Sequence, residues 1–351
     1  MLKINVIKIL ILAAFSSFSA FLWTPLLTRF LYHYKLWRKE ARTKTIDGKP
    51  APVFNQLHKE RETKVPRLGG LLIWMTTIFV AFLFSFLANI SDNFWLQKLN
   101  FLSRDQTWLP LATLLAASLL GLGDDVLQIF GKGKYSGGGI RFTRRLIIVL
   151  LIGIVGALWF YFKLDWSSLH IPLYGNVEIG AWYLPFFVIV VLACWAGGVI
   201  DGIDGLAAGS FSVIFGAFSI IAYSNLQYNL AAFCAVLSGT ILAFLWFNIP
   251  PARFYMGETG MMGLTATLAV VAFLTNSVLV LPIIAGLLVI EAGSVILQLF
   301  SKRFFNRKIF LCAPFHHHLE AKGWPPEKIV MRFWVLNITL AAIGVAIRLL
   351  G

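Results

Sequence analysis

The stretch LAAGSFSVIFGAFSIIAYS (206–224), followed closely by NLAAFCAVLSGTILAFLWFNI (229–249), decides the fold class. Neither run contains a charged residue, and only four residues separate them. About 20 consecutive apolar residues are enough to cross the hydrocarbon core of a bilayer as a helix. The two runs therefore predict a pair of adjacent, antiparallel membrane helices.

Runs of this kind recur along the whole chain. The first is interpreted as a membrane helix and not as a signal peptide, because no small-residue cleavage site follows it. The polar stretches between the runs are too short for a separate soluble core, so residues 1–351 are expected to form one all-α integral membrane domain. We predict about ten transmembrane helices, at 8–30, 68–90, 107–123, 146–163, 181–200, 206–224, 229–249, 261–276, 278–300 and 329–350.

The composition supports this class. Hydrophobic residues make up 58% and charged residues 13% of the chain, whereas about a quarter of the residues in a soluble protein are charged. The net charge of +14 lies in loops beside apolar runs, which favours membrane lipid or a phosphorylated substrate as partner and no nucleic acid. Cys194, Cys234 and Cys312 show no spacing that indicates a disulfide or a metal site.

The cations also predict an orientation. They are concentrated in the loops after the first, third and ninth helices, within residues 35–67, 132–145 and 302–328. By the positive-inside rule these loops are cytoplasmic and both termini are periplasmic. The polar motifs described next fall on the same side, so they can meet at one cytoplasmic surface.

Two acidic pairs could carry chemistry. Asp124 and Asp125 end the third helix, and adjacent carboxylates at a membrane edge repel each other unless a cation joins them. Asp201 and Asp204 lie in a glycine-rich segment, and if this segment is helical their spacing puts both carboxylates on one face. Each pair could bind Mg²⁺ or supply a base, or be a solvated helix end or turn.

The connector from Asn248 to Glu258 contains tandem prolines, which impose a rigid, non-helical course. It holds an amide, an aromatic ring and a carboxylate in fixed positions, or it is only a stiff link. The consecutive histidines His316, His317 and His318 are poorly spaced for Zn²⁺. They could bind phosphate or form a polar turn. Glu291, inside the ninth run, is expected to be paired or functional, with a structural hydrogen bond favoured.

Together these groups suit a Mg²⁺-assisted displacement at phosphorus. Their order along the chain resembles the polyprenyl-phosphate N-acetylhexosamine-1-phosphate transferases, from about residue 20 to the end. The motifs are Gly-Asp-Asp (123–125), Asp-Gly-Ile-Asp-Gly-Leu (201–206), Phe-Asn to Met-Gly-Glu (247–258), Pro-Phe-His-His-His-Leu-Glu (314–320) and Arg-Phe-Trp (332–334). The histidine segment most resembles the members that transfer phospho-N-acetylmuramoyl-pentapeptide.

The resemblance implies transfer of phospho-MurNAc-pentapeptide from UDP-MurNAc-pentapeptide to undecaprenyl phosphate, giving lipid I and UMP. It further implies a Mg²⁺ cofactor, a homodimer and a bacterial inner membrane location. Asp124, Asp125 and Glu258 would be catalytic, and Asp124, Asp201 and Glu258 would hold the metal. The substrate would be bound by Asp204, Asn248, Tyr255, Arg145, His316, His317 and His318, with Asn248 and Tyr255 at the uridine end.

Several positions depart from the family pattern. Glu258 replaces an aspartate, Gln128 a lysine and Gly198 an asparagine, while Arg145 lies about where a further family lysine falls and can restore a cation. Residues 66–70, Pro-Arg-Leu-Gly-Gly, replace the usual Thr-Pro-Thr-Met-Gly-Gly.

Three alternatives stay open. The departures leave room for a sister transferase using UDP-N-acetylglucosamine or another UDP-sugar, and for a catalytically silent homologue. The intramembrane Glu291 and the helix-breaking glycines would suit a transporter. A transporter would place its polar groups near the middle of the membrane, whereas here they gather at one face.

Overall fold

The computed structural model describes residues 2–39, 63–131 and 139–351. In this part of the chain, nine helices are long and apolar enough to cross a membrane. They centre on α1 (Leu2–His33), α3 (Gly70–Ile90), α5 (Trp108–Ile129), α6 (Phe142–Leu158), α7 (Tyr183–Ala196), α8 (Leu206–Ser224), α9 (Tyr228–Asn248), α10 (Gly257–Leu274) and α14 (Pro326–Leu349). These helices confirm the all-α membrane class and nine of the ten predicted spans.

Short irregular turns extend two of the helices. A π-helical turn, Trp159–Lys163, continues α6, and 3-10 turns at Gly180–Trp182 and Gly197–Ile200 flank α7. The predicted orientation also depends on cations at 42–61 and at 132 and 134, and these lie outside the described residues.

The prediction of a single ninth helix over 278–300 is wrong. The structure has a short helix, α11 (Leu281–Ile284), a break at Ala285, and a second helix, α12 (Gly286–Phe304). Glu291 and the two cations in its last turn give α12 more charged residues than the apolar windows of the nine spans contain.

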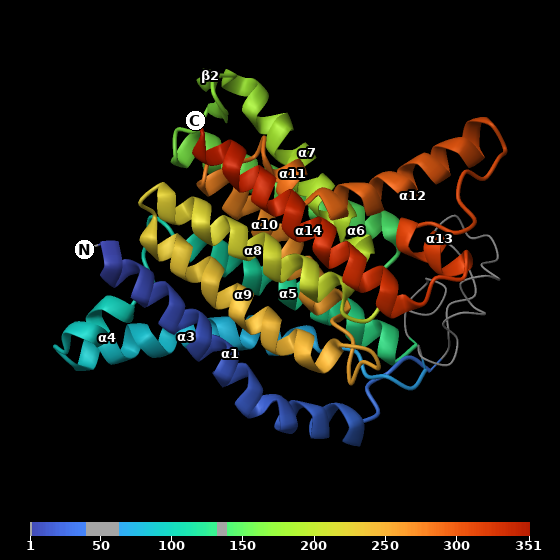
Figure 1. The fold of residues 1–351 in the computed structure, drawn as a ribbon, viewed down its shortest axis with the longest axis horizontal. Helices are drawn as coiled ribbons and strands as arrows, with labels where there is room; N and C mark the ends of the chain where they lie inside the picture. Colours follow the sequence, from blue (N-terminus) through green and yellow to red (C-terminus); the bar gives the residue numbers. More distant parts are fainter. Residues whose placement is uncertain (1, 40–62, 132–138) are drawn as a thin grey trace.

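Close packing on α14 accompanies this break. A Cβ at Gly286 would lie 2.7 Å from Leu340 Cδ1, and a Cβ at Gly344 would lie 2.4 Å from Ile284 Cγ1. Figure 1 shows α12 leaving the bundle at an angle, while α11 stays beside α14.

Three small elements were not predicted. A hairpin of β1 (Ser168–Ile171) and β2 (Gly175–Glu178) follows α6, with Ser168 opposite Glu178 in antiparallel register. The short helix α4 (Phe94–Leu99) follows α3, and α13 (Phe315–Ala321) contains the three histidines. Segments this short carry too little periodicity to be distinguished from loops in a sequence.

Helices α8, α9 and α10 form the centre of the bundle, since most of their residues are buried, whereas only 22% of the apolar window is buried in α1 and in the span of α6. Exposed apolar residues on the outer helices fit contact with lipid. Figure 1 shows both chain ends on one side of the bundle and α13 on the opposite side.

Two glycines allow the close approach that builds the site. A Cβ at Gly121 of α5 would lie 2.1 Å from Glu258 O, and a Cβ at Gly70 of α3 would lie 2.3 Å from Gly260 N. Small residues at helix contacts let backbones come together in a membrane bundle. As a result, the end of α5 lies directly against the start of α10.

Candidate active site

The contact between α5 and α10 brings the acidic pair Asp124–Asp125 next to Glu258. Both aspartates are buried, and the Glu258 side chain is 26% exposed. Asp125 Oδ2 accepts a hydrogen bond from Thr259 N at 2.9 Å. Gly257 has a φ of +72° and a Cβ there would lie 2.4 Å from Asp125 Oδ2, so only glycine fits this turn.

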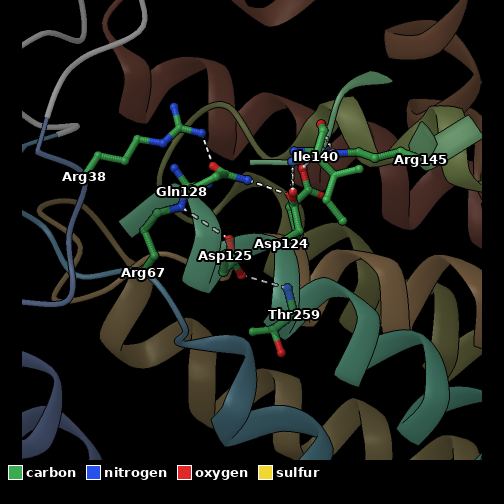
Figure 2. Close-up of polar contacts among 9 residues, drawn as sticks. Arg38, Arg67, Asp124, Asp125, Gln128, Ile140, Arg145 and Thr259 are labelled. Atoms are coloured by element: carbon green, nitrogen blue, oxygen red, sulfur yellow. Dashed lines mark hydrogen bonds and ion pairs between the residues drawn. The ribbon is translucent and has the colours of Figure 1, made fainter. Parts of the chain in front are cut away.

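Asp124 is surrounded by donors (Figure 2). Its Oδ1 accepts from Ile140 N at 2.6 Å, and its Oδ2 accepts from Gln128 Nε2 at 2.7 Å. Arg145 Nη2 lies 2.5 Å from Asp124 Oδ2. A buried carboxylate is tolerated when donors and a cation satisfy it in this way.

Arg145 joins Asp124 to Glu258. Its other terminal nitrogen, Nη1, lies 2.5 Å from Glu258 Oε1, and the arginine side chain is only 16% exposed. The structure therefore brings together three residues that the sequence analysis placed in the site, from α5, α6 and α10. One guanidinium shared by two carboxylates is an arrangement that can also receive phosphate oxygens.

Arg38 is a site residue that the sequence analysis missed. Its side chain is buried, and its Nη2 donates to Gln128 Oε1, while the amide nitrogen of Gln128 bonds to Asp124 (Figure 2). The uncharged Gln128 thus connects a cation to the catalytic candidate. In the sequence, Arg38 is one of many cations in a long basic loop, and no signal separates it from the others.

Arg67 is a second missed cation. Its Nε lies 3.5 Å from Asp125 Oδ1 (Figure 2). Two backbone hydrogen bonds fix the segment: Tyr255 N donates to Pro66 O and Gly69 N donates to Tyr255 O, both at 2.8 Å. The stretch at 66–70 that departs from the family pattern therefore carries a cation to the acidic pair.

Asp201 and Asp204 lie in a turn and not in a helix, so the condition for a shared helical face is not met. The turn follows the 3-10 segment Gly197–Ile200, and Asp204 Oδ2 accepts from Ala252 N at 3.1 Å. Burial raises the pKa of Asp201 to about 7. The Arg67 guanidinium opposes this rise, and the carboxylates of Glu258, Asp125 and Asp204 add to it.

Asn248 ties this turn to the proline connector. Its Oδ1 accepts from Gly205 N at 2.9 Å, and its Nδ2 donates to Phe254 O at 3.0 Å. The connector is non-helical up to α10, as predicted. Asn248 and Tyr255 both stand beside the site, but their contact with a uridine group stays a prediction.

The three histidines face three different partners, as their consecutive positions require. His316 Nδ1 lies 2.9 Å from Glu291 Oε2, and both side chains are fully buried. His317 Nδ1 lies 2.5 Å from Glu320 Oε2, and His318 Nδ1 accepts from Leu311 N at 3.1 Å.

Glu291 is paired, as an intramembrane carboxylate was expected to be. A Cβ at Gly202 would lie 2.1 Å from His316 Nε2. The Glu291–His316 pair thus lies directly against the turn that carries Asp201, and residue 202 must be glycine.

The structure does not gather a three-ligand metal cluster. Among residues 2–39, 63–131 and 139–351, no three histidine, cysteine, aspartate or glutamate side chains could hold one ion together. Asp124 and Glu258 share Arg145, while Asp201 lies on the adjoining turn. The metal-binding role of these three carboxylates stays a prediction.

Comparison with known proteins relates the chain that carries this site to a protein family. The sequence model of glycosyl transferase family 4 matches residues 107–276, which include the Asp124–Asp125 pair, the Asp201–Asp204 turn and Glu258.

Three curated relatives are each named phospho-N-acetylmuramoyl-pentapeptide-transferase. The protein of Pelagibacter ubique (strain HTCC1062) is 32% identical over 310 residues, which cover 82% of this chain and 81% of the relative. That of Ruegeria sp. (strain TM1040) is 34% identical over 326 residues, covering 85% and 84%. That of Granulibacter bethesdensis (strain ATCC BAA-1260 / CGDNIH1) is 35% identical over 310 residues, covering 82% and 81%. The chain therefore belongs to the family of phospho-N-acetylmuramoyl-pentapeptide transferases, and its residues 107–276 match glycosyl transferase family 4.

Proposed function

We propose that this chain transfers phospho-MurNAc-pentapeptide from UDP-MurNAc-pentapeptide to undecaprenyl phosphate, forming lipid I and releasing UMP. The names of its relatives support phospho-N-acetylmuramoyl-pentapeptide as the transferred group. The observation that carries the proposal is the arrangement of Asp124, Arg145 and Glu258, in which one guanidinium bridges two carboxylates 2.5 Å away on each side. A transporter would have its site near the middle of the membrane. Here the polar groups lie at the end of α5, which does not favour a transporter.

Asp124 would orient the lipid phosphate and accept its proton. In the described residues, the partners of its carboxylate are all donors: Gln128, Ile140 and Arg145. When a phosphate oxygen takes the guanidinium of Arg145, Oδ2 of Asp124 becomes available to the incoming phosphate. Because the site is buried, cations there stabilise developing charge more strongly than in water. Arg67, beside Asp125, would supply the second cation.

The residues present fit Mg²⁺. Carboxylate oxygens are its preferred ligands, and it usually takes one or two of them together with substrate phosphates. In the described residues, the buried Oδ1 of Asp125 accepts no hydrogen bond, so acceptor capacity remains in the cluster. One or two carboxylates, drawn from Asp124, Glu258 and Asp201, would hold the ion together with the substrate phosphates, and the ion would neutralise charge on the phosphate oxygens.

The remaining assignments complete the proposal. Asp204 would line the nucleotide site, and Asn248 and Tyr255 would contact the uridine end. The histidines of α13 would contact the amino sugar or its phosphate. The protein would work in the bacterial plasma membrane as a homodimer, with this site facing the cytoplasm.

The test is UMP release by purified, detergent-solubilised protein with undecaprenyl phosphate and Mg²⁺. UDP-MurNAc-pentapeptide and UDP-N-acetylglucosamine are supplied in parallel reactions. Release from the first substrate alone is expected. Release from the second alone would assign the chain to the sister transferases, for which Arg67 beside Asp125 is the favouring observation. No release from either substrate by folded protein would contradict both.

Asp124→Asn is the matched variant for this assay. The amide keeps the size of the side chain but removes the base and the charge that Arg145 faces. We expect turnover to fall by about 10²-fold or more, with the elution profile of the folded protein unchanged. Turnover close to that of the wild type would contradict the role of Asp124.

A further inference from the structure

The tip of α12 carries groups that the proposed reaction does not use. The helix ends at Phe304, and the chain turns back through residues 305–311 toward α13. Figure 1 shows this tip projecting beyond the other helices of the bundle. Leu311 N donates to His318 Nδ1 at 3.1 Å, so the tip lies on the side of the bundle that carries the histidines.

Side-chain hydrogen bonds hold the returning segment in place. Gln298 Oε1 accepts from Ile309 N at 2.9 Å and from Phe310 N at 3.0 Å, and Gln298 Nε2 donates to Phe310 O at 2.9 Å. Ser301 Oγ donates to Arg307 O at 2.9 Å. The tip is therefore a defined hairpin, and its charged side chains start from fixed backbone positions.

Positive charge is concentrated on this hairpin. Residues 301–312 contain four cations and no acidic residue. In the part of the chain that the structure describes, no carboxylate forms an ion pair with Arg303, Arg307 or Lys308. Uncompensated cations on a fixed frame attract an anion from outside the chain.

Exposed aromatic rings adjoin these cations. Phe300, Phe304 and Phe305 are 52%, 67% and 65% exposed. The Phe300 ring lies 4.5 Å from that of Phe304 and 6.1 Å from that of Phe305, measured between centroids. Apolar rings next to cations characterise segments at the boundary between lipid headgroups and acyl chains.

A cavity lies where the cations meet the rings. Its volume is about 480 Å³, and its lining consists of Ser301, Phe305, Arg307, Lys308 and Ile309. The lining thus combines two cations with apolar side chains. This combination matches a phosphate group attached to hydrocarbon, which is the chemistry of a phospholipid at the membrane surface.

We propose that the α12 tip binds the headgroup of an anionic glycerophospholipid in the membrane leaflet on the α13 side. Arg307 and Lys308 contact the phosphate, and Phe304 and Phe305 lie among the acyl chains. This site is separate from the proposed transfer reaction, because none of these residues lies in the acidic cluster. The bound lipid anchors α12, the helix that positions Glu291 against His316.

Native mass spectrometry of the full-length, detergent-solubilised protein tests this site. Phosphatidylglycerol and phosphatidylcholine with identical acyl chains are titrated separately, and inorganic phosphate is titrated as a third ligand. We expect phosphatidylglycerol to bind more tightly than phosphatidylcholine. In Arg307→Gln/Lys308→Gln its affinity is expected to fall on the order of tenfold. Both side chains are exposed, so the fold is expected to persist.

Lys98→Gln/Lys163→Gln is the matched control, since it removes the same charge at α4 and at the end of α6, before the β hairpin. Unchanged phosphatidylglycerol binding by this control supports the proposal. An equal loss in both double variants would indicate bulk charge and overturn it, as would equal binding of the two lipids. Inorganic phosphate binding as tightly as phosphatidylglycerol, with the same dependence on Arg307 and Lys308, would also overturn it. Because the readout is binding, these outcomes do not depend on UMP release.

Discussion

Gln128 lies between a buried cation and a buried carboxylate. Its amide accepts from Arg38 and donates to Asp124, so both of its polar ends are used. An amide can bridge unlike partners in this way because it offers both a carbonyl acceptor and an NH₂ donor. The resemblance predicts a lysine at this position. Here the positive charge comes from Arg38, which reaches Asp124 through the side chain of Gln128.

This arrangement predicts the effect of restoring the lysine. Gln128→Lys would put an ammonium group against the guanidinium of Arg38 in a buried site, and like charges there repel each other. We expect a lower melting temperature and slower UMP release. Adding Arg38→Gln should recover both, with a favourable coupling free energy of about 1 kcal/mol or more. The check is a double-mutant cycle on thermal unfolding, and strictly additive effects would contradict the Arg38–Gln128 contact.

At the residue level, the sequence predicted the carboxylates but not their cationic partners. Asp124, Asp125 and Glu258 stand out because acidic residues are rare beside apolar runs. Arg38 and Arg67 do not stand out, because the basic loop contains many similar residues. Their places depend on tertiary contacts, such as those of residues 66–70 with Tyr255, that no local pattern encodes.

At the level of elements, the Glu291–His316 pair joins α12 to α13. Glu291 also accepts from the backbone N of His316, at 3.2 Å to Oε1. The sequence predicted that Glu291 would be paired, but His316 is 25 residues away and its spacing gives no hint of the contact. Apolar runs likewise identified nine helices, yet 278–300 is divided in two at Ala285, next to the point where Gly286 packs against α14.

Replacement of Glu291 tests how much this pair stabilises the contact between α12 and α13. Glu291→Ala would leave His316 N and Nδ1 buried without an acceptor, at a cost of about 2–3 kcal/mol in the free energy of unfolding. Glu291→Gln keeps an acceptor oxygen and should cost less. Thermal unfolding in detergent gives the comparison, with Glu320→Gln as control, because the contact of Glu320 with His317 lies within α13. Equal losses in the alanine and glutamine variants would count against the hydrogen-bonded joint.

At the scale of the whole molecule, the broken ninth span preserves the direction of the chain. α11 packs beside the C-terminal half of α14, where Gly344 lies against Ile284. α13 packs beside the N-terminal half, where the rings of Phe315 and Phe333 stack 6.4 Å apart. Between these points α12 carries the chain from the β-hairpin side of the bundle to the histidine side. Together α11 and α12 therefore still reverse the side of the membrane, as one predicted span would.

This continuity predicts which sides of the membrane the two ends of the bundle face. The histidine side carries the cations of the α12 tip, so the positive-inside rule places it in the cytoplasm and the β hairpin outside. In a Cys312→Ser background, whose other two cysteines are buried, single cysteines replace Tyr174 on the hairpin and Lys322 after α13. A membrane-impermeant maleimide added to intact cells without an outer membrane barrier should label Tyr174→Cys, and should label Lys322→Cys only after the cells are opened.

Labelling with the sides exchanged would contradict the orientation. Labelling of both cysteines from one side would mean that α11 and α12 do not return the chain across the membrane, because an even number of crossings would then separate the two positions.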